Sequence, residues 1–483
     1  ILLTSFIKGD SETIKDIYLN GRLGNITEIY KDHDLDKKSL DFQLLYLEAL
    51  IRTGEKERAD KLFEKIKNIA GNKFDIHVLE GMRHLSRGDL ISSADSINSI
   101  SKEKLSSVSL IQLRYFNELY KRDFSAAGSL LNTLLDHKSG FGKSNLFFLL
   151  ALEFYRSAMD FEKLSSLYRK KMKGIKKRDN RNYYANLKLN HKLYKRKPGV
   201  YFRIESAKER VEIPFESGNK GALKSIVLKK GNKKFSILLD TGNTSGWLIH
   251  SRDLREELKS LRGGRTVMQV GTESGKLDGF NIFCRILDFE EFTLSGLYGN
   301  YIPKPRQDFF DANLNPAMIR NRIVSLDFIN NRLILRTRER FFADIEQPGK
   351  MEVMKIPWFG HKYPMVPVLC NSKNGLAIIE TGAENISIES DFAVELGIPL
   401  TERSKYLSNG KIFKYSLGSV NVQLGKYLFV RDKAEVWPLK RFRNHLTGFA
   451  PHVIIGPEAL EGKFVVSFIP EENILVFEYE RKN

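Results

Sequence analysis

The stretch SILLDTGNTSGWLIHS, Ser236 to Ser251, decides the fold, because AIIETGAENISIES, Ala377 to Ser390, repeats its pattern later in the chain. Each stretch begins as an apolar strand, reaches an acidic residue followed by Thr-Gly, and continues as a second apolar strand. The acid is Asp240 in the first copy and Glu380 in the second. A glycine two residues after the acid allows the backbone to turn there. The chain therefore carries one carboxylate-bearing turn twice.

The sequence around the two turns also matches at several points. VEIPF (Val211 to Phe215) precedes the first turn, and MKIPW (Met354 to Trp358) precedes the second. IVSLDFINNRLIL (Ile323 to Leu335) closes the first copy and VVSFIPEENILVF (Val465 to Phe477) the second, each with a strand, a polar turn and a returning strand. We therefore predict two β-rich lobes related by duplication, at residues 201–345 and 346–483.

These features resemble the pepsin and retropepsin superfamily of aspartic proteases, over about residues 211–480. The resemblance implies an all-β bilobal domain with Asp240 and Glu380 as the catalytic pair. It implies that Thr241 and Thr381 hydrogen-bond across to the opposite lobe, and that a polypeptide substrate lies extended in the cleft between the lobes. No cofactor is implied. The motifs that carry the resemblance are Leu238-Leu239-Asp240-Thr241-Gly242, Ile378-Ile379-Glu380-Thr381-Gly382 and Val453-Ile454-Ile455-Gly456.

Two facing carboxyl groups can hydrolyse a peptide bond without a metal ion, because like charges at short range do not both ionise and one group keeps a proton. One group then acts as base on a water and the other as acid on the carbonyl oxygen. Glu380 departs from the family pattern by one methylene group. Asn243 and Ala383 stand where serine or threonine often supports the carboxylate, and ANLNPAM (312–318) replaces an apolar-apolar-glycine motif.

The segment VMQVGTESGKLDGF, Val267 to Phe280, is the candidate flap over the cleft. Gly271, Thr272 and Gly275 are the candidate tip residues, since glycines suit a mobile hairpin tip. The segment lacks the tyrosine that pepsin-like flaps carry. We expect an active endopeptidase that cleaves between apolar residues; a pseudoprotease that binds peptides without cutting them, or a purely structural scaffold, are the alternatives.

Residues 1–171 predict a helical-repeat domain. Pairs of apolar-periodic helices recur, with turn residues Gly54, Gly88 and Arg122 spaced 34 residues apart. Small residues recur on the inner helix face at Ala59, Ala94 and Ala127. The repeat resembles tetratricopeptide repeats, which implies a surface for a peptide or protein partner; a scaffold that packs on the next domain is the alternative. GFGKS (140–144) is predicted to be a loop, not a phosphate-binding motif, because no strand precedes it.

Residues 172–200 are predicted to be a basic connector helix. Thirteen of the Lys and Arg residues lie within 169–197 together with the single acid Asp179, in a chain whose net charge is +19. Tyr184, Leu187, His191 and Tyr194 follow helical spacing, which predicts an amphipathic helix with a solvated basic face. We expect no nucleic-acid site, and leave an anionic membrane surface open as an alternative partner.

The rest of the sequence adds few further site types. The nine histidines show no metal-binding spacing, so no metal site is predicted. Cys284 and Cys370 are predicted to be separate buried thiols. No apolar run is long enough to cross a membrane, and we expect a monomer. ILLTSFI at the start reads as the remainder of a removed apolar segment, which favours an exported or cell-envelope protein over a cytoplasmic one.

Overall fold

The computed structural model of the chain forms two compact units. The first unit consists of Ile1–Phe154 with two later segments, Ser372–Leu376 and Pro438–His452, and the second consists of the remaining residues. The structure describes Ile14, Ile17, Tyr18 and residues 23–480 apart from residues 32, 71–73, 90–91, 94, 97–110, 112–113, 116–117, 119–123, 137–144, 158–159, 174–180, 196–202, 218–222, 244–245, 258–260, 271–274, 303–309, 347–350, 358–363, 407–411, 440–441, 443–449 and 473.

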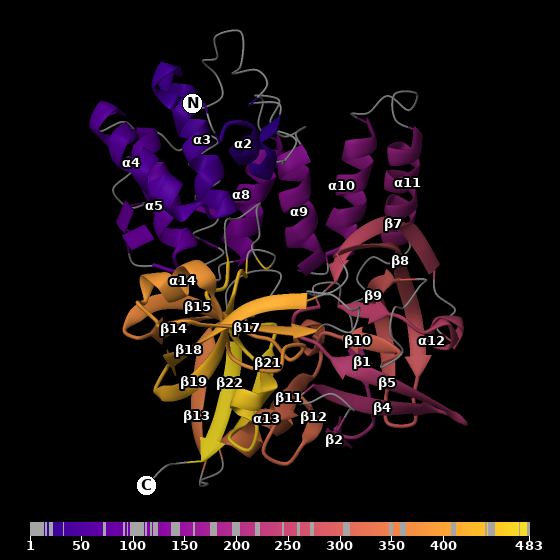
Figure 1. Cartoon of the computed structure of the whole chain (residues 1–483). Helices are drawn as coiled ribbons and strands as arrows, with labels where there is room; N and C mark the ends of the chain where they lie inside the picture. Colours follow the sequence, from indigo (N-terminus) through magenta and orange to yellow (C-terminus); the bar gives the residue numbers. More distant parts are fainter. Residues whose placement is uncertain are drawn as a thin grey trace. The chain divides into compact units, whose positions relative to one another are not determined.

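The elements of the first unit before Phe154 are helical (Figure 1). The helix Lys56–Ala70 carries its buried residues on one face, as an amphipathic helix does, whereas the helix Leu40–Thr53 is buried at every position from Phe42 to Thr53. The elements are α2 (Leu23–Ile29), η1 (Leu35–Lys37), α3 (Leu40–Thr53), α4 (Lys56–Ala70), α5 (Phe74–Ser86), α8 (Phe124–Asp136) and α9 (Asn145–Ser157), the last of which continues into the second unit.

The turn expected at Gly54 is present. Ser39 caps the start of α3, where its Oγ accepts a hydrogen bond from the Phe42 N–H at 3.3 Å. Gly54 ends the helix with φ of 81°, a left-handed conformation that glycine adopts without strain. Ala59 and Ala127 are buried, as expected for inner-face positions. Ala94, Arg122 and GFGKS lie outside the described residues, and the tetratricopeptide-like repeat stays a prediction.

Two helices open the described part of the second unit. They are α10 (Phe161–Lys173) and α11 (Arg181–Lys195), which lie side by side with the rings of Tyr168 and Tyr194 stacked 5.6 Å apart (Figure 1). The amphipathic helix predicted in the basic segment is α11. Its Leu187 and Tyr194 are buried, whereas Lys188, Lys192 and Lys195 are exposed.

Two β-sheets follow the same plan. We call them the Asp240 sheet and the Glu380 sheet, after the acid that each one carries. The Asp240 sheet contains β1 (Arg203–Glu205), β3 (Glu216–Ser217), β4 (Lys224–Lys230), β5 (Lys233–Leu239), β6 (Trp247–Ile249), β7 (Leu261–Val270), β8 (Gly275–Asp288), β9 (Thr293–Tyr301) and β10 (Ala312–Leu314). The Glu380 sheet contains β14 (Met365–Cys370), β15 (Lys373–Ile379), β16 (Ser387–Glu389), β17 (Thr401–Tyr406), β18 (Ile412–Leu424), β19 (Tyr427–Trp437) and β20 (Val453–Ile455).

The order of strands shows the correspondence between the sheets. Apart from β1 and β3, the Asp240 sheet reads β4-β5-β10-β6-β9-β8-β7, and the Glu380 sheet reads β14-β15-β20-β16-β19-β18-β17. The short helices match as well: α12 (Arg252–Glu257) follows β6, and α14 (Ser390–Glu395) follows β16. Equivalent positions of the two sheets can therefore be compared residue by residue.

A third sheet, the central sheet, joins the two closing hairpins. Its order, β13-β22-β21-β11-β12-β2, has corresponding strands at equal distances from the middle. In the middle pair Ser325 lies opposite Ser467, and the two hydroxyl groups hydrogen-bond at 2.7 Å. The predicted hairpins are β11–β12 and β21–β22, which confirms both turns. The strands are β2 (Arg210–Pro214), β11 (Ile323–Asp327), β12 (Arg332–Arg336), β13 (Met351–Pro357), β21 (Phe464–Ile469) and β22 (Ile474–Glu480).

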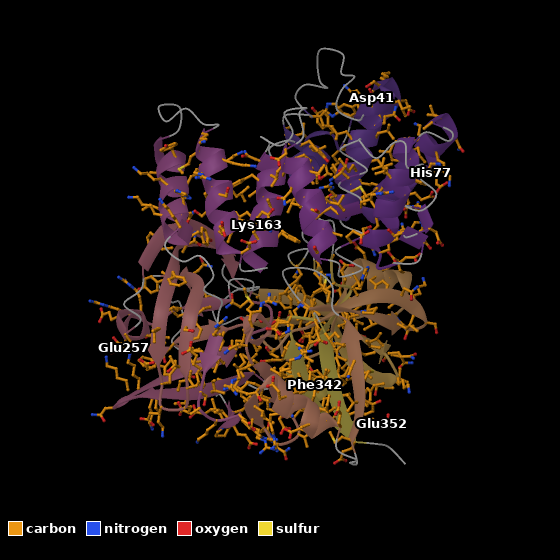
Figure 2. The ribbon with its side chains drawn as sticks, turned by 180° about the vertical axis from the view of Figure 1, so that it is seen from behind. Asp41, His77, Lys163, Glu257, Phe342 and Glu352 are labelled. Atoms are coloured by element: carbon orange, nitrogen blue, oxygen red, sulfur yellow. The ribbon has the colours of Figure 1, made fainter. Side chains whose placement is uncertain are left out.

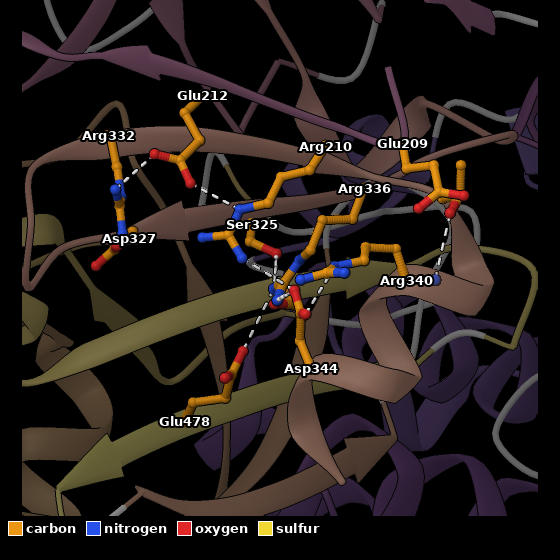
Figure 3. A network of polar contacts seen from close by, with 12 residues as sticks. Glu209, Arg210, Glu212, Ser325, Asp327, Arg332, Arg336, Arg340, Asp344 and Glu478 are labelled. Atoms are coloured by element: carbon orange, nitrogen blue, oxygen red, sulfur yellow. Dashed lines mark hydrogen bonds and ion pairs between the residues drawn. The ribbon is translucent and has the colours of Figure 1, made fainter. Parts of the chain in front are cut away.

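A polar network ties helix α13 (Arg338–Ile345) to the central sheet (Figure 3). Arg336 donates to the Ser325 hydroxyl at 2.7 Å and pairs with Asp344 at 3.3 Å. Apolar packing supports the same helix, because Phe341 is buried in a cluster with central-sheet residues and Phe342 packs against that cluster. Figure 2 labels Phe342 among the side chains of the chain. The helix thus holds one face of the central sheet by both kinds of contact.

Candidate functional site

The two acids occupy equivalent places at the ends of paired strands. Asp240 follows β5, and its N–H donates to the Leu314 carbonyl of β10 at 2.8 Å. Glu380 follows β15, and its N–H donates to the Ile455 carbonyl of β20 at 3.0 Å. Each main chain then turns, so that the acid's carbonyl accepts from the N–H three residues later. The backbone therefore presents both carboxyl groups in the same way.

Thr241 and Thr381 join the two turns by reciprocal hydrogen bonds. Each threonine N–H donates to the other threonine's Oγ1 at 3.0 Å. The Thr241 hydroxyl donates to the Ile379 carbonyl at 2.5 Å, and the Thr381 hydroxyl donates to the Leu239 carbonyl at 2.6 Å. Both side chains are fully buried, so water does not compete for these bonds. This arrangement fixes the separation of the two acid-bearing turns.

The carboxyl groups of Asp240 and Glu380 lie close together. The Gly242 N–H lies 3.0 Å from Asp240 Oδ1 and 3.1 Å from Glu380 Oε1, and it donates to both. Glu380 Oε1 also accepts from the Gly382 N–H at 2.8 Å. Because two like charges at such short range do not both form readily, one of the two groups holds a proton. The longer glutamate side chain thus crosses to the N–H of the opposite turn.

The surroundings of the pair favour protonation. Burial raises the pKa of Asp240, against the effect of hydrogen bonds that favour its ionised form. Burial also raises the pKa of Glu380 well above its usual range, and the neighbouring Asp240 charge raises it further. Two acids at such short range titrate as one unit. The pair therefore holds a single proton over an interval of pH, which is the state that general acid and general base catalysis need.

Gly242 and Gly382 leave room for the two carboxyl groups, because neither residue has a side chain. A Cβ atom on Gly242 would lie 1.7 Å from Glu380 Oε2, and one on Gly382 would lie 2.9 Å from Asp240 Oδ1. Neither glycine has a positive φ. The sequence suggested that glycine was needed for backbone freedom, whereas the structure shows that close approach of the carboxyl groups requires it. The demand is more severe at Gly242, where Glu380 lies over the main chain.

Two residues of the site were not predicted from the sequence. Asn313 of β10 donates from Nδ2 to Asp240 Oδ2 at 2.8 Å, and His250 Nε2 lies 3.2 Å from Asn313 Oδ1. Asn243 lies beside them and donates to the Asn313 carbonyl at 3.1 Å. The only sequence signal for Asn313 was ANLNPAM, which replaces the apolar-apolar-glycine motif. This signal does not identify Asp240 as the partner of Asn313.

The candidate flap is a hairpin formed by β7 and β8, with Val270 opposite Gly275. Gly275 is the first residue of β8, whereas Gly271 and Thr272 lie outside the described residues. In the middle of β8, the Asn281 side chain donates to the Asn190 side chain of α11 at 2.9 Å in a buried contact. The basic helix α11 also packs on β7, so it holds the hairpin that the sequence assigns to the flap.

No group of three or more His, Cys, Asp or Glu side chains gathers at one point within the described residues. Cys370 is a buried free thiol, as predicted, and burial raises its pKa to about 12. The side chain of Cys284 is outside the described set. None of the described helices combines the length and the apolar character that a membrane crossing requires.

Comparisons with known proteins give structural similarity only. No family model matches the sequence, and no curated protein matches it either. A solved structure similar to this chain is a retropepsin-like aspartic protease from Rickettsia conorii, with a TM-score of 0.21 and 19% identity over 27% of this chain and 92% of that chain. Another is the basic 7S globulin from soybean, with a TM-score of 0.32 and 9% identity over 56% of this chain and 94% of that one.

Proposed function

We propose that this protein is an aspartic endopeptidase in which a water activated between Asp240 and Glu380 attacks the peptide carbonyl. The observation that carries the proposal is the meeting of the two carboxyl groups at the Gly242 N–H. Burial raises the pKa of both acids, so a state with one proton on the pair is reached at less acidic pH than for exposed carboxyl groups. Such a pair supplies a base and an acid at one place.

The proposal includes a bilobal aspartic-protease-like domain whose lobes are the Asp240 sheet and the Glu380 sheet. The matching strand orders and the reciprocal threonine bonds support it. A polypeptide substrate would lie extended in the cleft between these lobes, under the β7–β8 hairpin. The N-terminal helices, as tetratricopeptide-like repeats, would bind the substrate or a partner protein. The basic helix α11 and its flanks remain the proposed contact for an anionic membrane surface.

The alternative is a catalytically inactive protein that binds peptides at the same site. The observation that favours it is the position of Glu380 Oε1, which accepts from Gly242 and Gly382 together. A carboxylate held by both N–H groups leans toward Asp240 and reduces the room for a water between the acids. Shortening the side chain by one methylene group would withdraw the carboxyl group by about 1.5 Å.

The test is cleavage of an unfolded polypeptide by the purified protein and by three variants. Asp240→Asn should lower the rate by about 10²- to 10⁴-fold, as expected for loss of an acid–base group. A pepstatin-type inhibitor should reduce the wild-type rate. Glu380→Asp keeps an acid at the second position, and Glu380→Gln removes it.

The outcomes separate the two functions. Cleavage that persists unchanged in Asp240→Asn would exclude the proposed pair. If the wild type binds peptide without cleaving it, and Glu380→Asp acquires cleavage, the protein is a binding protein whose glutamate prevents turnover. If neither protein cleaves while both bind peptide, the site has a binding function alone.

A further inference from the structure

The two sheets carry different side chains at one pair of equivalent positions, on the strands that run beside the acid-bearing strands. Strand β10 pairs in parallel with β5, and Asn313 lies beside Leu238. Strand β20 pairs in parallel with β15, and Ile454 lies beside Ile378. Asn313 and Ile454 are therefore the same position of the two matched sheets. An amide side chain stands at this position in the Asp240 sheet and an alkyl side chain in the Glu380 sheet, so the two acids have unequal surroundings.

Asn313 adds a donor to Asp240 that Glu380 does not receive. Its Nδ2 donates to Asp240 Oδ2 at 2.8 Å, while the Gly242 N–H donates to Oδ1, so each carboxylate oxygen has a donor. Within the described residues, Glu380 accepts hydrogen bonds from the main chain of Gly242 and Gly382, both at Oε1. Donors stabilise the ionised form of a carboxyl group. The negative charge is thus better stabilised on Asp240.

The Asn313 amide links Asp240 to His250. An ionised carboxylate only accepts hydrogen bonds, so Asn313 must turn Nδ2 toward Asp240 and Oδ1 toward His250. His250 Nε2, at 3.2 Å from that oxygen, must then donate. Burial lowers the pKa of His250 in spite of the nearby Asp240 and Asp311 carboxylates, so the neutral ring with its proton on Nε2 suffices. The main-chain N–H of His250 donates to the Asp311 carbonyl at 2.9 Å, and this bond fixes the position of the residue.

We propose that Asn313 is a positioning residue that makes Asp240 the ionised member of the pair and leaves the proton on Glu380, and that His250 holds the amide in this orientation. The catalytic meaning of this inference rests on the proposed function. Asp240 takes a proton from the water as its oxygen bonds to the peptide carbon, and Glu380 gives its proton to the carbonyl oxygen. The pair then still holds one proton, which now lies on Asp240.

The first test measures thermal unfolding as a function of pH and needs no activity. Asn313→Leu removes the donor and keeps the number and branching of the side-chain heavy atoms. The melting temperature of this variant should fall below that of the wild type by an amount that grows from about pH 4 to about pH 8, because the loss concerns the ionised form of Asp240. A difference that is the same at every pH would mean that Asn313 only fills space, and would overturn the proposal.

Matched variants isolate the hydrogen-bond chain. Ile454→Leu changes the equivalent position in the Glu380 sheet without removing a donor, so any loss should be independent of pH. His250→Gln keeps an N–H donor and should follow the wild type, whereas His250→Phe should show a smaller form of the Asn313→Leu effect. A wild-type profile for His250→Phe would remove His250 from the proposal.

The second test uses peptide cleavage. In Asn313→Leu the acidic limb of the pH–rate profile should move to higher pH by about one unit, the size expected for one hydrogen bond to a charge. An unmoved limb in an active variant would contradict the assignment of the charge to Asp240. A wild type that cleaves nothing at any pH would refute the proposed function, and the unfolding series would still decide whether Asn313 stabilises the charge.

Discussion

The Asp240 turn and the Glu380 turn have the same backbone hydrogen bonds but different side-chain chemistry. Both follow a strand that pairs in parallel with a second strand, and both threonines bond across to the other turn. The acids differ by one methylene group, and the residues behind them are Asn313 and Ile454. A duplicated chain can thus conserve the geometry that positions two acids while it separates their proton affinities. Two identical subunits could not encode such a difference.

The central sheet, away from the acids, also carries different side chains at equivalent positions of the two halves. Arg336 and Glu478 are equivalent positions of the two hairpins, since Arg336 pairs with Ile323 and Glu478 pairs with Val465. Their side chains form an ion pair at 3.4 Å across the middle of the sheet (Figure 3). Identical halves would have placed two like charges here. The divergence of the halves therefore converts a repulsive contact into an attractive one.

The largest effect is expected on the free energy of unfolding, from the threonine hydrogen bonds that the two turns have in common. Thr241→Val removes the hydroxyl group that accepts from the Thr381 N–H and donates to the Ile379 carbonyl, and Thr381→Val removes its equivalent. Each variant leaves two buried groups without partners, so the free energy of unfolding should fall by about 3 kcal/mol in both. Urea denaturation measures this loss.

Thr241→Ser and Thr381→Ser are the controls, because serine keeps the hydroxyl group; each should lose less than about 1 kcal/mol. A large loss for one valine variant and none for the other would mean that the two turns are not equivalent in the way the hydrogen bonds indicate.

The two glycines offer a sharper comparison with a somewhat smaller effect. In Gly242→Ala the new methyl group would collide with the Glu380 carboxyl group, which must move by more than 1 Å. Such a displacement should lower the cleavage rate by about 10²-fold. Gly382→Ala has a milder contact, at 2.9 Å, and should retain more activity.

Gly24→Ala serves as the control for this pair, since no atom lies within 4 Å of the added methyl group. The rate should not change in this variant. Equal losses in Gly242→Ala and Gly382→Ala would contradict the finding that Glu380 leans toward the Asp240 turn.

The smallest effect concerns the pH dependence of stability. Glu380 has a folded-state pKa raised above its unfolded value, so its protonation stabilises the fold; this contribution is complete below the unfolded pKa and is lost as the pH rises through the folded pKa. Glu380→Gln does not titrate. Relative to the wild type, its free energy of unfolding should therefore increase from acid to neutral pH, by an amount on the order of 1 kcal/mol. A difference that decreases toward neutral pH would reverse the sign of the shift. Thermal unfolding in a series of buffers measures it.

Much of the β-rich region could be predicted because its signals are local. The two apolar runs separated by a polar turn in IVSLDFINNRLIL and in VVSFIPEENILVF predict two hairpins, and the structure contains both as β11–β12 and β21–β22. The helix α11 was predicted for the same reason, from the spacing of Leu187 and Tyr194. The role of Asn313 could not be predicted, since it lies 73 residues from Asp240 in the chain and its contact depends on the pairing of β10 with β5.

The sequence by itself determined that the chain carries two equivalent acid-bearing turns, because a repeated motif with matching strands around it is visible without coordinates. Only the tertiary structure decided that Glu380 reaches the Gly242 N–H and that Asn313 and His250 stand behind Asp240 alone. The physical reason is range. Strand and helix periodicity is encoded by neighbours in the chain, whereas the protonation of two acids depends on side chains that strand pairing brings together from distant positions.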